Sequence, residues 1–337
     1  MVTSSLPWSS EDEKILCLSQ RRLVWSVARV AENVGISEER VRHRIARLAG
    51  INVPVRLERN EVRFLRYLDL LSPDDLCLAM GLDRQALVHW WQIDSTNDAC
   101  LRLETNSPVR FIVAESQSAG RGRRNNCWFS DFAGSILFSF RHVASVDSDF
   151  RIFSLVFSLF VVEAVSAHYP ELSCWVKWPN DIYLGGKKWM GILVDIVHGM
   201  STQTIIAGLG CNIRSDIVDQ VESAVGLSSQ TNEVDKNTLA QLLMQACIDA
   251  SIYCETSDFS ALVNRYNQYH LHHGQVINYR FEDQTHNAVV LGISVNGHLI
   301  VRNGDQDLYL HAEQISHIRL ASSNRSAVYS LSDTRVS

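Results

Sequence analysis

The sequence predicts an α+β fold built in three parts, because its hydrophobic pattern changes twice along the 337 residues. An arginine-rich segment with the periodicity of helices comes first. A longer middle region alternates strand-like and helix-like runs, and the last part consists of short strands separated by turns. A hydrophobic content of 46% and a charged content of 20% are typical of globular proteins, and this length suits two or three domains.

Positive charge is concentrated in the first part of the chain. Residues 21–66 contain eleven arginines against five glutamates, so this segment carries +6 while the whole chain has a formal net charge of −6. This asymmetry indicates that one module meets a polyanion such as DNA and that the remainder has a different function.

Residues 31–48 follow the pattern of a helix–turn–helix. Ala31 and Gly35 permit a close helix crossing with a tight turn, and Ser37 is predicted to cap the second helix. Apolar residues then recur on one face of that helix. Four basic residues are left for an open face suited to phosphates and base edges, with a merely solvated basic face as the alternative: Arg40, His43, Arg44 and Arg47.

The middle region is predicted to begin at Ser72-Pro73-Asp74-Asp75, which has the composition of a helix N-terminus. Four strands and two helices are expected after it, at Phe111–Glu115, Ser135–Phe140, Gly191–Val197 and Thr204–Ala207, and at Ile152–His168 and Lys236–Tyr253.

The tail beyond Gly274 is predicted to be a small β-barrel or sandwich. Its strands are expected at Val276–Phe281, Ala288–Ile293 and His298–Arg302. Asn296-Gly297 between the last two indicates a hairpin, in which both turn positions are expected to take positive φ.

Cysteine spacing and hydrophobicity favour a cytoplasmic protein without a membrane segment. The eight cysteines include no Cys-x-x-Cys pair, so we interpret them as reduced thiols and predict no metal site. The most apolar run, Ile152–Ala167, contains Glu163 and three serines and is too short to span a bilayer. The N-terminus also lacks the pattern of a signal peptide.

A glycine- and arginine-rich loop, Glu115–Arg124, follows a predicted strand. Its glycines let the backbone approach a phosphate, and its guanidinium groups can bind phosphate or carboxylate oxygens in pairs. Such a loop would close over a nucleotide and exclude water from a reactive acyl-phosphate, although a charged surface turn has the same composition.

Lys177-Trp178-Pro179-Asn180-Asp181 predicts a turn that brings Lys177 and Asp181 together at strand ends. A second turn at Gly185-Gly186 would form a hairpin that directs Lys188 back toward Asp181. Paired lysine and aspartate suit phosphoryl and acyl transfer, because the cation neutralises developing charge and the carboxylate orients an amine. A structural ion pair is the alternative.

Two further segments carry weaker signals. Ser95-Thr96-Asn97 precedes a helical stretch, so these residues are expected to cap that helix, to bind a small polar ligand, or to do both. Gly208-Leu209-Gly210-Cys211-Asn212 ends a strand, where two glycines would let the backbone meet an adenine while Asn212 reads its edge.

These four segments together, in this order, resemble the biotin–protein ligases, from about Trp91 to Arg319. The basic head matches the bifunctional bacterial members that also repress the biotin operon. The resemblance implies a winged helix–turn–helix-like DNA-binding domain at 1–68, a catalytic domain related to class II aminoacyl-tRNA synthetases at 69–271, and an SH3-like barrel at 272–325.

The resemblance also implies the reaction. Biotin and Mg²⁺-ATP would form biotinyl-5′-AMP and pyrophosphate, and a lysine of the biotin carboxyl carrier protein would then take the biotin and release AMP. Operator DNA and a ligand-promoted homodimer are the other expected partners.

Site roles follow from the same resemblance. Ser95, Thr96, Asn97 and Gln117 would hold the ureido head of biotin, and Arg121, Gly122 and Arg123 would wrap the adenylate. Lys188 would contact the biotin carbonyl and the phosphate, Asp181 would orient the acceptor lysine, and Asn212 would meet the adenine. Lys177 would support the site, and Arg319 would reach the nucleotide, although an extra residue near His317 shifts the alignment there.

Two features depart from the family pattern. Asn125-Asn126-Cys127 stand where the family continues its loop with Gly-Arg, which removes flexibility and one positive charge. Leu57–Phe64, where a wing would lie, contains no glycine.

Three alternatives remain open at this point. A lipoate-type protein ligase shares the catalytic architecture but is not expected to combine Gly-Arg-Gly-Arg with Lys-Trp-Pro-Asn-Asp. A ligand-sensing transcription factor with weak catalysis need not keep Asp181, Lys188 and Arg121. An active ligase could also use its head only to gate substrate access.

Overall fold

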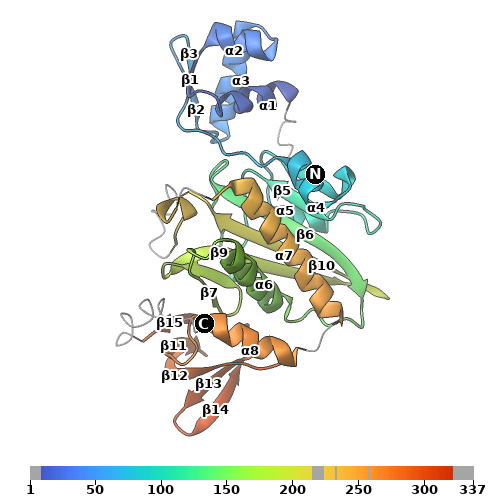
Figure 1. The fold of residues 1–337 in the computed structure, drawn as a ribbon, viewed down its shortest axis with the longest axis vertical. Helices are drawn as coiled ribbons and strands as arrows, with labels where there is room; N and C mark the ends of the chain where they lie inside the picture. Colours follow the sequence, from blue (N-terminus) through green and yellow to red (C-terminus); the bar gives the residue numbers. More distant parts are fainter. Residues whose placement is uncertain (1–8, 215–223, 232–233, 257–258, 322–337) are drawn as a thin grey trace.

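The structure is a computed structural model in which an N-terminal head, a central α+β body and a C-terminal sheet follow one another along the longest axis (Figure 1). It describes residues 9–214, 224–231, 234–256 and 259–321. The ends of the outer predicted domains, residues 1–8 and 322–325, therefore lie outside the described residues. No helix of the described part is long and apolar enough to cross a membrane.

The head packs three helices against a three-stranded antiparallel sheet of order β1-β3-β2. Ser37 caps α3 by accepting a hydrogen bond from the amide of Arg40 at 3.2 Å, and Gly35 ends α2 with a φ of +79°, as the turn requires. The elements are α1 (Ser10–Leu18), β1 (Val24–Ser26), α2 (Val27–Val34), α3 (Glu38–Gly50), β2 (Val55–Glu58) and β3 (Glu61–Phe64).

The segment without glycine does form a hairpin, contrary to what its composition suggested. Strands β2 and β3 pair from Val55 opposite Phe64 to Glu58 opposite Glu61. Arg59 supplies the left-handed turn residue with a φ of +53°, and Arg42 of α3 donates a hydrogen bond to its carbonyl at 3.3 Å. The contact from Arg42 is thus made at Arg59, the residue whose backbone conformation glycine would adopt without strain.

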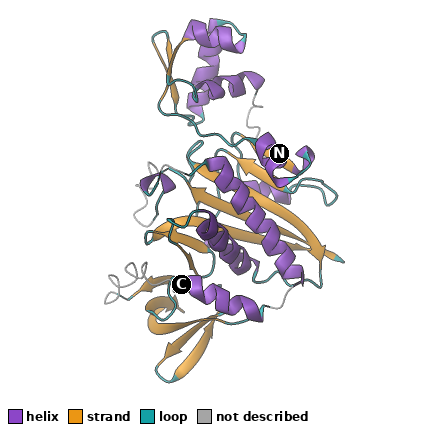
Figure 2. Ribbon diagram, in the orientation of Figure 1, coloured by secondary structure: helices purple, strands orange, loops and turns teal. Residues whose placement is uncertain are grey.

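The central body is a seven-stranded sheet of order β4-β5-β6-β10-β9-β8-β7, in which only β4 and β5 run parallel (Figure 2). All predicted strands and helices of this region are present, with longer bounds for most of them. The elements are α4 (Pro73–Met80), β4 (Leu87–Trp90), α5 (Thr96–Leu101), β5 (Phe111–Ala114), β6 (Ser135–Ser145), α6 (Phe153–His168), β7 (Cys174–Lys177), β8 (Asp181–Leu184), β9 (Lys187–His198), β10 (Thr202–Asn212), α7 (Lys236–Thr256) and α8 (Ser260–Tyr269).

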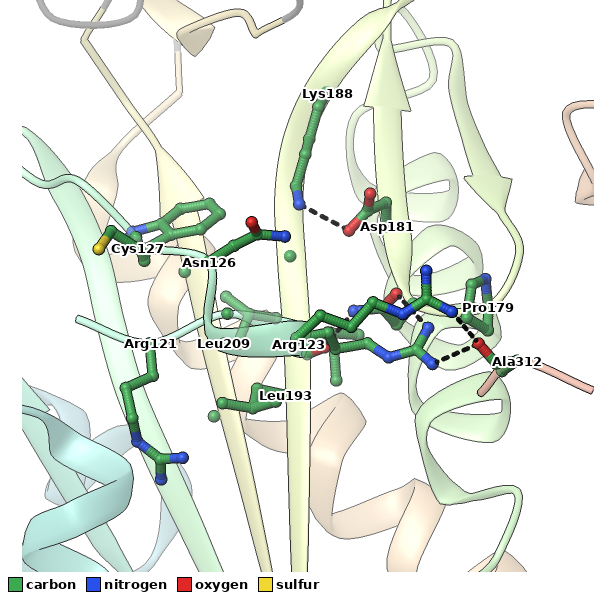
Figure 3. A pocket seen from close by; sticks show the side chains of 18 of the residues that line it. Arg121, Arg123, Asn126, Cys127, Pro179, Asp181, Lys188, Leu193, Leu209 and Ala312 are labelled. Carbon is green, nitrogen blue, oxygen red and sulfur yellow. Dashed lines mark hydrogen bonds and ion pairs between the residues drawn. The ribbon is translucent and has the colours of Figure 1, made fainter. Parts of the chain in front are cut away.

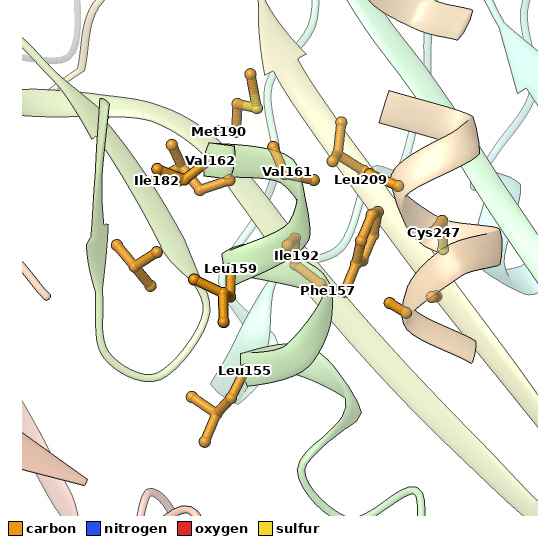
Figure 4. Close-up of a cluster of buried hydrophobic side chains, with 14 of the residues drawn as sticks. Leu155, Phe157, Leu159, Val161, Val162, Ile182, Met190, Ile192, Leu209 and Cys247 are labelled. Carbon is orange, nitrogen blue, oxygen red and sulfur yellow. The ribbon is translucent and has the colours of Figure 1, made fainter. Parts of the chain in front are cut away.

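Helices α6 and α7 cover one face of this sheet and enclose the main core (Figures 1 and 4). Ile205, Ala207 and Leu209 of β10 point into that core, whereas Ile206 joins a small cluster under α5. Because side chains alternate along a strand, the even-numbered residues of β10 face the side of α5. This face carries the candidate site.

The C-terminal part is a five-stranded antiparallel sheet of order β14-β13-β12-β11-β15. Its terminal strands β14 and β15 do not pair with each other in the described chain, so the sheet is not closed into the barrel that was expected. The elements are β11 (Val276–Phe281), β12 (Gln284–Ile293), β13 (Leu299–Asn303), β14 (Gln306–Leu310) and β15 (Ile315–Leu320).

The hairpin turn between β12 and β13 is longer than predicted. The amide of Gly297 donates to the carbonyl of Ser294 at 2.8 Å, and the amide of Ser294 donates to the carbonyl of His298 at 2.9 Å. Gly297 alone takes a positive φ, of +78°, so the expectation for Asn296 was wrong. Three residues with glycine last connect the paired Ser294 and His298, and this type of loop also fits the twist of the two strands.

A fully buried ion pair joins the head linker to the central body. The Lys236 ammonium lies 2.9 Å from the Glu115 carboxylate and also donates to the carbonyl of Asp69 at 2.7 Å. The other Glu115 oxygen accepts from the amide of Leu71 at 2.6 Å. Burial alone would raise the pKa of Glu115, but Lys236 and His89 outweigh it and hold that pKa below its usual value.

We predict that Lys236→Met destabilises the protein by about 3–5 kcal/mol, because it leaves Glu115 buried without its cation. The free energy of urea-induced unfolding measures this at neutral pH. The loss should already shrink as pH falls toward about 4.3, the ordinary pKa of a glutamate. Without Lys236, burial raises the pKa of Glu115, so its protonation begins above this pH and removes the charge that needs a partner.

Lys14→Met, on the exposed surface of α1, is the matched control and should change stability by less than about 0.5 kcal/mol. The double variant Glu115→Gln/Lys236→Met should recover part of the loss, because neither charge remains. Equal stability of wild type and Lys236→Met would show that the pair contributes nothing.

Candidate functional site

A cavity of about 250 Å³ lies on the face of the central sheet that α6 and α7 leave open. Four segments distant in sequence line it, together with part of the C-terminal sheet. Of the predicted site residues it brings together Ser95, Thr96, Asn97, Gln117, Arg121, Gly122, Arg123, Lys177, Asp181 and Lys188.

One end of the cavity is a buried polar pocket at the start of α5. Ser95 caps this helix, as one of the alternatives predicted, by accepting from the amide of Asp98 at 3.4 Å. The side-chain carbonyl of Gln117 accepts from the amide of Thr96 at 2.7 Å and from its hydroxyl at 3.1 Å. Asn97 donates to Asp195 at 2.9 Å. Ser95 therefore caps α5 and also lines the cavity, and Thr96 and Asn97 line the cavity beside it.

The two glycines of β10 form the floor of the cavity, although for a different reason from the predicted adenine contact. A Cβ at Gly208 would lie 2.1 Å from the side-chain oxygen of Asn97, and one at Gly210 would lie 2.4 Å from the Trp128 indole. The glycines thus make room for two side chains of the protein itself. Trp128 lies against Gly210, and its indole nitrogen is buried without a hydrogen-bond partner among the described residues.

The lysine–aspartate pair forms as the hairpin geometry predicted. Asp181 stands opposite Lys177 across β7 and β8, and Gly185 and Gly186 both take positive φ in the following turn. The Lys188 ammonium lies 2.7 Å from the Asp181 carboxylate (Figure 3). It also sits 5.6 Å from the centroid of the Trp128 ring.

A β-bulge decides which lysine reaches the cavity. Met190 pairs with Ile182 and Lys188 pairs with Tyr183, so Trp189 is an extra residue on β9. Strict alternation from Gly191 would place Lys187 on the cavity face. The bulge reverses the phase and directs Lys188 there instead.

Lys177 is held in a less hydrated position than Lys188. Its ammonium donates to the hydroxyl of Tyr183 at 2.9 Å. Burial lowers the pKa of Lys177, with Asp181 opposing and Arg319 reinforcing the shift. Burial also raises the pKa of Tyr183 to about 12, so its hydroxyl stays protonated.

The arginines of the loop are engaged with the rest of the protein. Arg121 forms ion pairs with Asp98 at 2.7 Å and with Asp195 at 3.0 Å. Arg123 donates to the carbonyl of Ala312 at 3.2 Å, and Arg124 donates to the same carbonyl at 3.0 Å (Figure 3). The loop therefore bridges the polar pocket and the C-terminal sheet.

Two predicted nucleotide residues do not line the cavity. Asn212 is buried at the end of β10, where its backbone carbonyl accepts from the Trp189 indole at 2.9 Å. Arg319 stands opposite Asn278 on the far side of a bulge in β15. Their contact with a nucleotide stays a prediction.

Several lining residues were not foreseen from the sequence: Trp128, Gly191, Leu193, Ala312 and His317. Asp195, which holds Asn97 and Arg121, was also missed. A single carboxylate within the apolar run Gly191–Val197 was the available signal for it. The remaining contacts depend on tertiary packing, and within the described chain no group of three or more metal-binding side chains occurs.

The basic face predicted for α3 is partly covered, so that prediction was wrong for two residues. Arg44 and Arg47 are only 13% and 16% exposed and lie 3.4 Å and 3.3 Å from the buried Asp12 of α1. Arg40 is 54% exposed and pairs with Glu11 at 2.8 Å, whereas His43 is exposed. The acidic residues of α1 precede the segment whose charge was counted, which is why this pairing was not anticipated.

Comparison with known proteins agrees with the sequence resemblance. Residues 91–212 match the model of the Biotin/lipoate A/B protein ligase family. The chain is 26% identical to the Bifunctional ligase/repressor BirA of Bacillus spizizenii over 291 residues, 83% of this chain and 85% of the relative. It is 28% identical to the Biotin--[acetyl-CoA-carboxylase] ligase of Paracoccus denitrificans, over 62% of this chain and 91% of that protein.

Other matches are more partial. The alignment with the BirA protein of Escherichia coli K12 is 33% identical but spans 45% of this chain and 49% of that relative. Among solved structures, the biotin protein ligase of Aquifex aeolicus in complex with biotin and ATP is similar in fold. It has a TM-score of 0.59 and 22% identity, and the match covers 70% of this chain and 100% of that chain.

We predict that Gly210→Ala lowers stability by about 1–3 kcal/mol, because the new methyl group would overlap the Trp128 indole. Thermal or urea unfolding measures the change. Gly50→Ala is the matched control, since nothing lies within 4 Å of a Cβ there. In a Trp128→Ala background the Gly210→Ala penalty should largely disappear. An equal penalty in both backgrounds would show that the methyl group meets something other than Trp128.

Proposed function

We propose that this chain, whose residues 91–212 belong to the Biotin/lipoate A/B protein ligase family, is a biotin–protein ligase. It would make biotinyl-5′-AMP from biotin and Mg²⁺-ATP and transfer the biotin to a lysine of a carrier protein. The name of the Paracoccus relative supports the biotin carboxyl carrier protein of acetyl-CoA carboxylase as the acceptor.

One observation carries the proposal. The Lys188–Asp181 pair, 2.7 Å apart, faces the same cavity as the buried polar pocket and the arginine loop. A site for joining a small acid to an amine through an adenylate needs these three parts. It needs a pocket for the acid, cations for the phosphates, and a carboxylate beside the reacting carbonyl.

The polar pocket suits the ureido head of biotin, which offers two N–H donors and one carbonyl acceptor. Ser95, Thr96, Asn97 and Gln117 present hydroxyl and amide groups there, almost all of them buried. This composition favours biotin over lipoate, the main alternative within the family. The ureido head can form hydrogen bonds with these polar groups, whereas the apolar dithiolane ring of lipoate offers them no hydrogen-bonding partner.

Lys188 is assigned to the first step. The biotin carboxylate attacks the α-phosphorus of ATP, the bond to the bridging oxygen breaks, and pyrophosphate leaves. The Lys188 ammonium stabilises the negative charge that builds up on the phosphate oxygens. Arg121, Gly122 and Arg123 wrap the adenylate, and for this Arg121 exchanges the carboxylates of Asp98 and Asp195 for ligand oxygens.

Asp181 is assigned to the second step. The acceptor amine attacks the carbonyl of biotinyl-5′-AMP, an amide bond forms, and AMP leaves. The Asp181 carboxylate orients that amine and accepts its hydrogen bond. Lys177 lies opposite Asp181 and supports its position, while adenine contact by Asn212 and nucleotide contact by Arg319 remain parts of the proposal.

The Lys188–Asp181 pair argues against a protein that only senses a ligand. A sensor needs a ligand pocket but no carboxylate aimed at an acceptor, whereas Asp181 is both paired with Lys188 and open to the cavity. Ligand-promoted dimerisation remains a separate expectation.

We propose further that the head is a winged helix–turn–helix that binds DNA, so that the protein also acts as a biotin-responsive repressor. Capped α3, the tight turn at Gly35 and the β2–β3 hairpin support this assignment. The names of the BirA relatives agree with it. Arg40, His43 and the hairpin residue Arg59 are exposed basic residues on these elements and would meet DNA.

We predict that Lys188→Ala lowers the rate of biotin-dependent pyrophosphate exchange by at least about a hundredfold, since a charge aimed at the transition state is lost. Lys187→Ala is the matched control, because its side chain lies one residue away and does not line the cavity. Its exchange rate should stay within twofold of wild type. Full exchange in Lys188→Ala would remove this residue from the reaction.

We predict that Arg40→Ala weakens binding to duplex DNA severalfold at low salt. It should also reduce the slope of log affinity against log salt concentration by about the amount expected for one phosphate contact. Glu11→Gln should strengthen binding, because it frees Arg40 and Arg44 from their carboxylate. Arg302→Ala, an ion-paired arginine of the C-terminal sheet, is the control for the charge change alone. Gel shifts that are the same for all three variants would argue against DNA binding through α3.

A further inference from the structure

A β-bulge interrupts the pairing of β15 with β11 beside the cavity. Arg319 stands opposite Asn278 and Ser316 stands opposite Arg280, so His317 and Ile318 together face Tyr279. His317 takes a φ of +53°, a left-handed conformation that side chains other than glycine seldom adopt. Bulges of this kind next to a site redirect a side chain, and strained residues gather where a ligand is held.

The bulge is held firmly against the arginine loop. Arg124 donates hydrogen bonds to the carbonyls of Ala312 and Glu313 at 3.0 Å and 3.2 Å and also contacts that of Ile315. Arg123 adds a hydrogen bond to Ala312 at 3.2 Å. As a result Ser316, His317 and Ile318 form one wall of the cavity, whereas Arg319 does not line it.

His317 carries the nitrogen-bearing side chain of this wall. In the described part of the chain it takes part in no hydrogen bond, ion pair or ring contact, whereas Asp181, Arg121 and Lys177 all have partners. Five arginine and lysine residues share the cavity with it: Arg121, Arg123, Arg124, Lys177 and Lys188. An imidazole that donates a hydrogen bond in such surroundings is suited to an anionic oxygen.

A β-bulge has a similar effect on β9, another strand that lines the cavity. The bulge at Trp189 directs Lys188, in place of Lys187, toward the cavity. The bulge in β15 brings the exposed residue His317 into the lining of the cavity, so that bulges in two strands from different parts of the fold each place one nitrogen-bearing residue at the same cavity.

We infer that His317 is a binding residue for the nucleotide, donating a hydrogen bond to the β- and γ-phosphates that leave as pyrophosphate. This inference rests on the proposed ligase function. When the bond between the α-phosphorus and the bridging oxygen breaks, the electron pair stays with pyrophosphate. His317 holds its oxygens without having to transfer a proton.

Three variants distinguish the effect of losing the imidazole from the effect of changing the backbone strain at His317. His317→Gly keeps the left-handed conformation at no steric cost but removes the side chain, and His317→Asn keeps both that conformation and a donor. Asp283→Gly is the matched control, because Asp283 has a φ of +63° in the β11–β12 turn and lies outside the cavity. The measurements are the KM values for ATP and pyrophosphate in biotin-dependent exchange, and the affinity for biotin.

His317→Gly should raise both KM values roughly ten- to a hundredfold, the range for a hydrogen bond to a charged group, and leave biotin affinity within twofold. His317→Asn should recover most of the loss, and Asp283→Gly should behave as wild type. A purely structural role predicts no loss in His317→Gly, whose backbone strain is relieved. Unchanged KM values in that variant would therefore overturn the inference.

Two further outcomes are distinguishable. If a non-hydrolysable biotinyl-5′-AMP analogue loses as much affinity as ATP does, His317 contacts the adenylate and the pyrophosphate assignment is wrong. If the wild-type chain catalyses no biotin-dependent exchange, the ligase proposal fails, and direct calorimetry with Mg²⁺-ATP then tests His317 separately. Weaker nucleotide binding by His317→Gly would still support the inference, and equal binding would overturn it.

Discussion

The alternation of side chains along β9 and β10 is the constraint on which the rest of the structure depends. Each strand has one face in the core under α6 and α7 and one face in the cavity. On β10 the cavity face is reduced to glycine at two positions, so the side chains of Asn97 and Trp128 can lie directly on the sheet. The site is therefore built on rigid strands, and its shape follows from the packing of the core beneath it.

Electrostatics joins the parts that this sheet places next to one another. The cations of the loop and the hairpin neutralise nearby carboxylates: Arg121 binds Asp98 and Asp195, and Lys188 binds Asp181. Incoming phosphate oxygens would replace these carboxylates as partners of the same cations. Such exchange keeps each cation paired with an anionic oxygen at every stage, and the carboxylates that are released are partly exposed to solvent.

Polar contacts also connect the head to the cavity. Arg66, in the linker, pairs with Asp131 at 2.8 Å, and the hydroxyl of Ser130 accepts from the amide of Gln117, the residue that holds Thr96. Phe132 packs into the hydrophobic core of the head. The buried Glu115–Lys236 pair holds the same linker where the loop begins. The head and the ligand pocket thus share one packed boundary, and each of them restrains the position of the other.

Much of the fold and the site was predictable from the sequence because it depends on local chemistry. Caps such as Ser37 and Ser95, the Gly185-Gly186 turn and the alternating apolar runs determined most elements. Motif order indicated the family whose model matches residues 91–212. These features need only neighbours in the chain, whose spacing is set by helix and strand geometry.

Only the tertiary structure decided the rest, because it depends on residues far apart in sequence. Three features arise in this way: the β-bulge at Trp189, the burial of Arg44 and Arg47 against α1, and the presence of His317, and not Arg319, in the cavity wall. A one-residue shift of register reverses which side chains face a cavity, and no local pattern reveals such a shift. The sequence by itself determined which chemical groups the chain carries, and packing determined which of those side chains face the cavity.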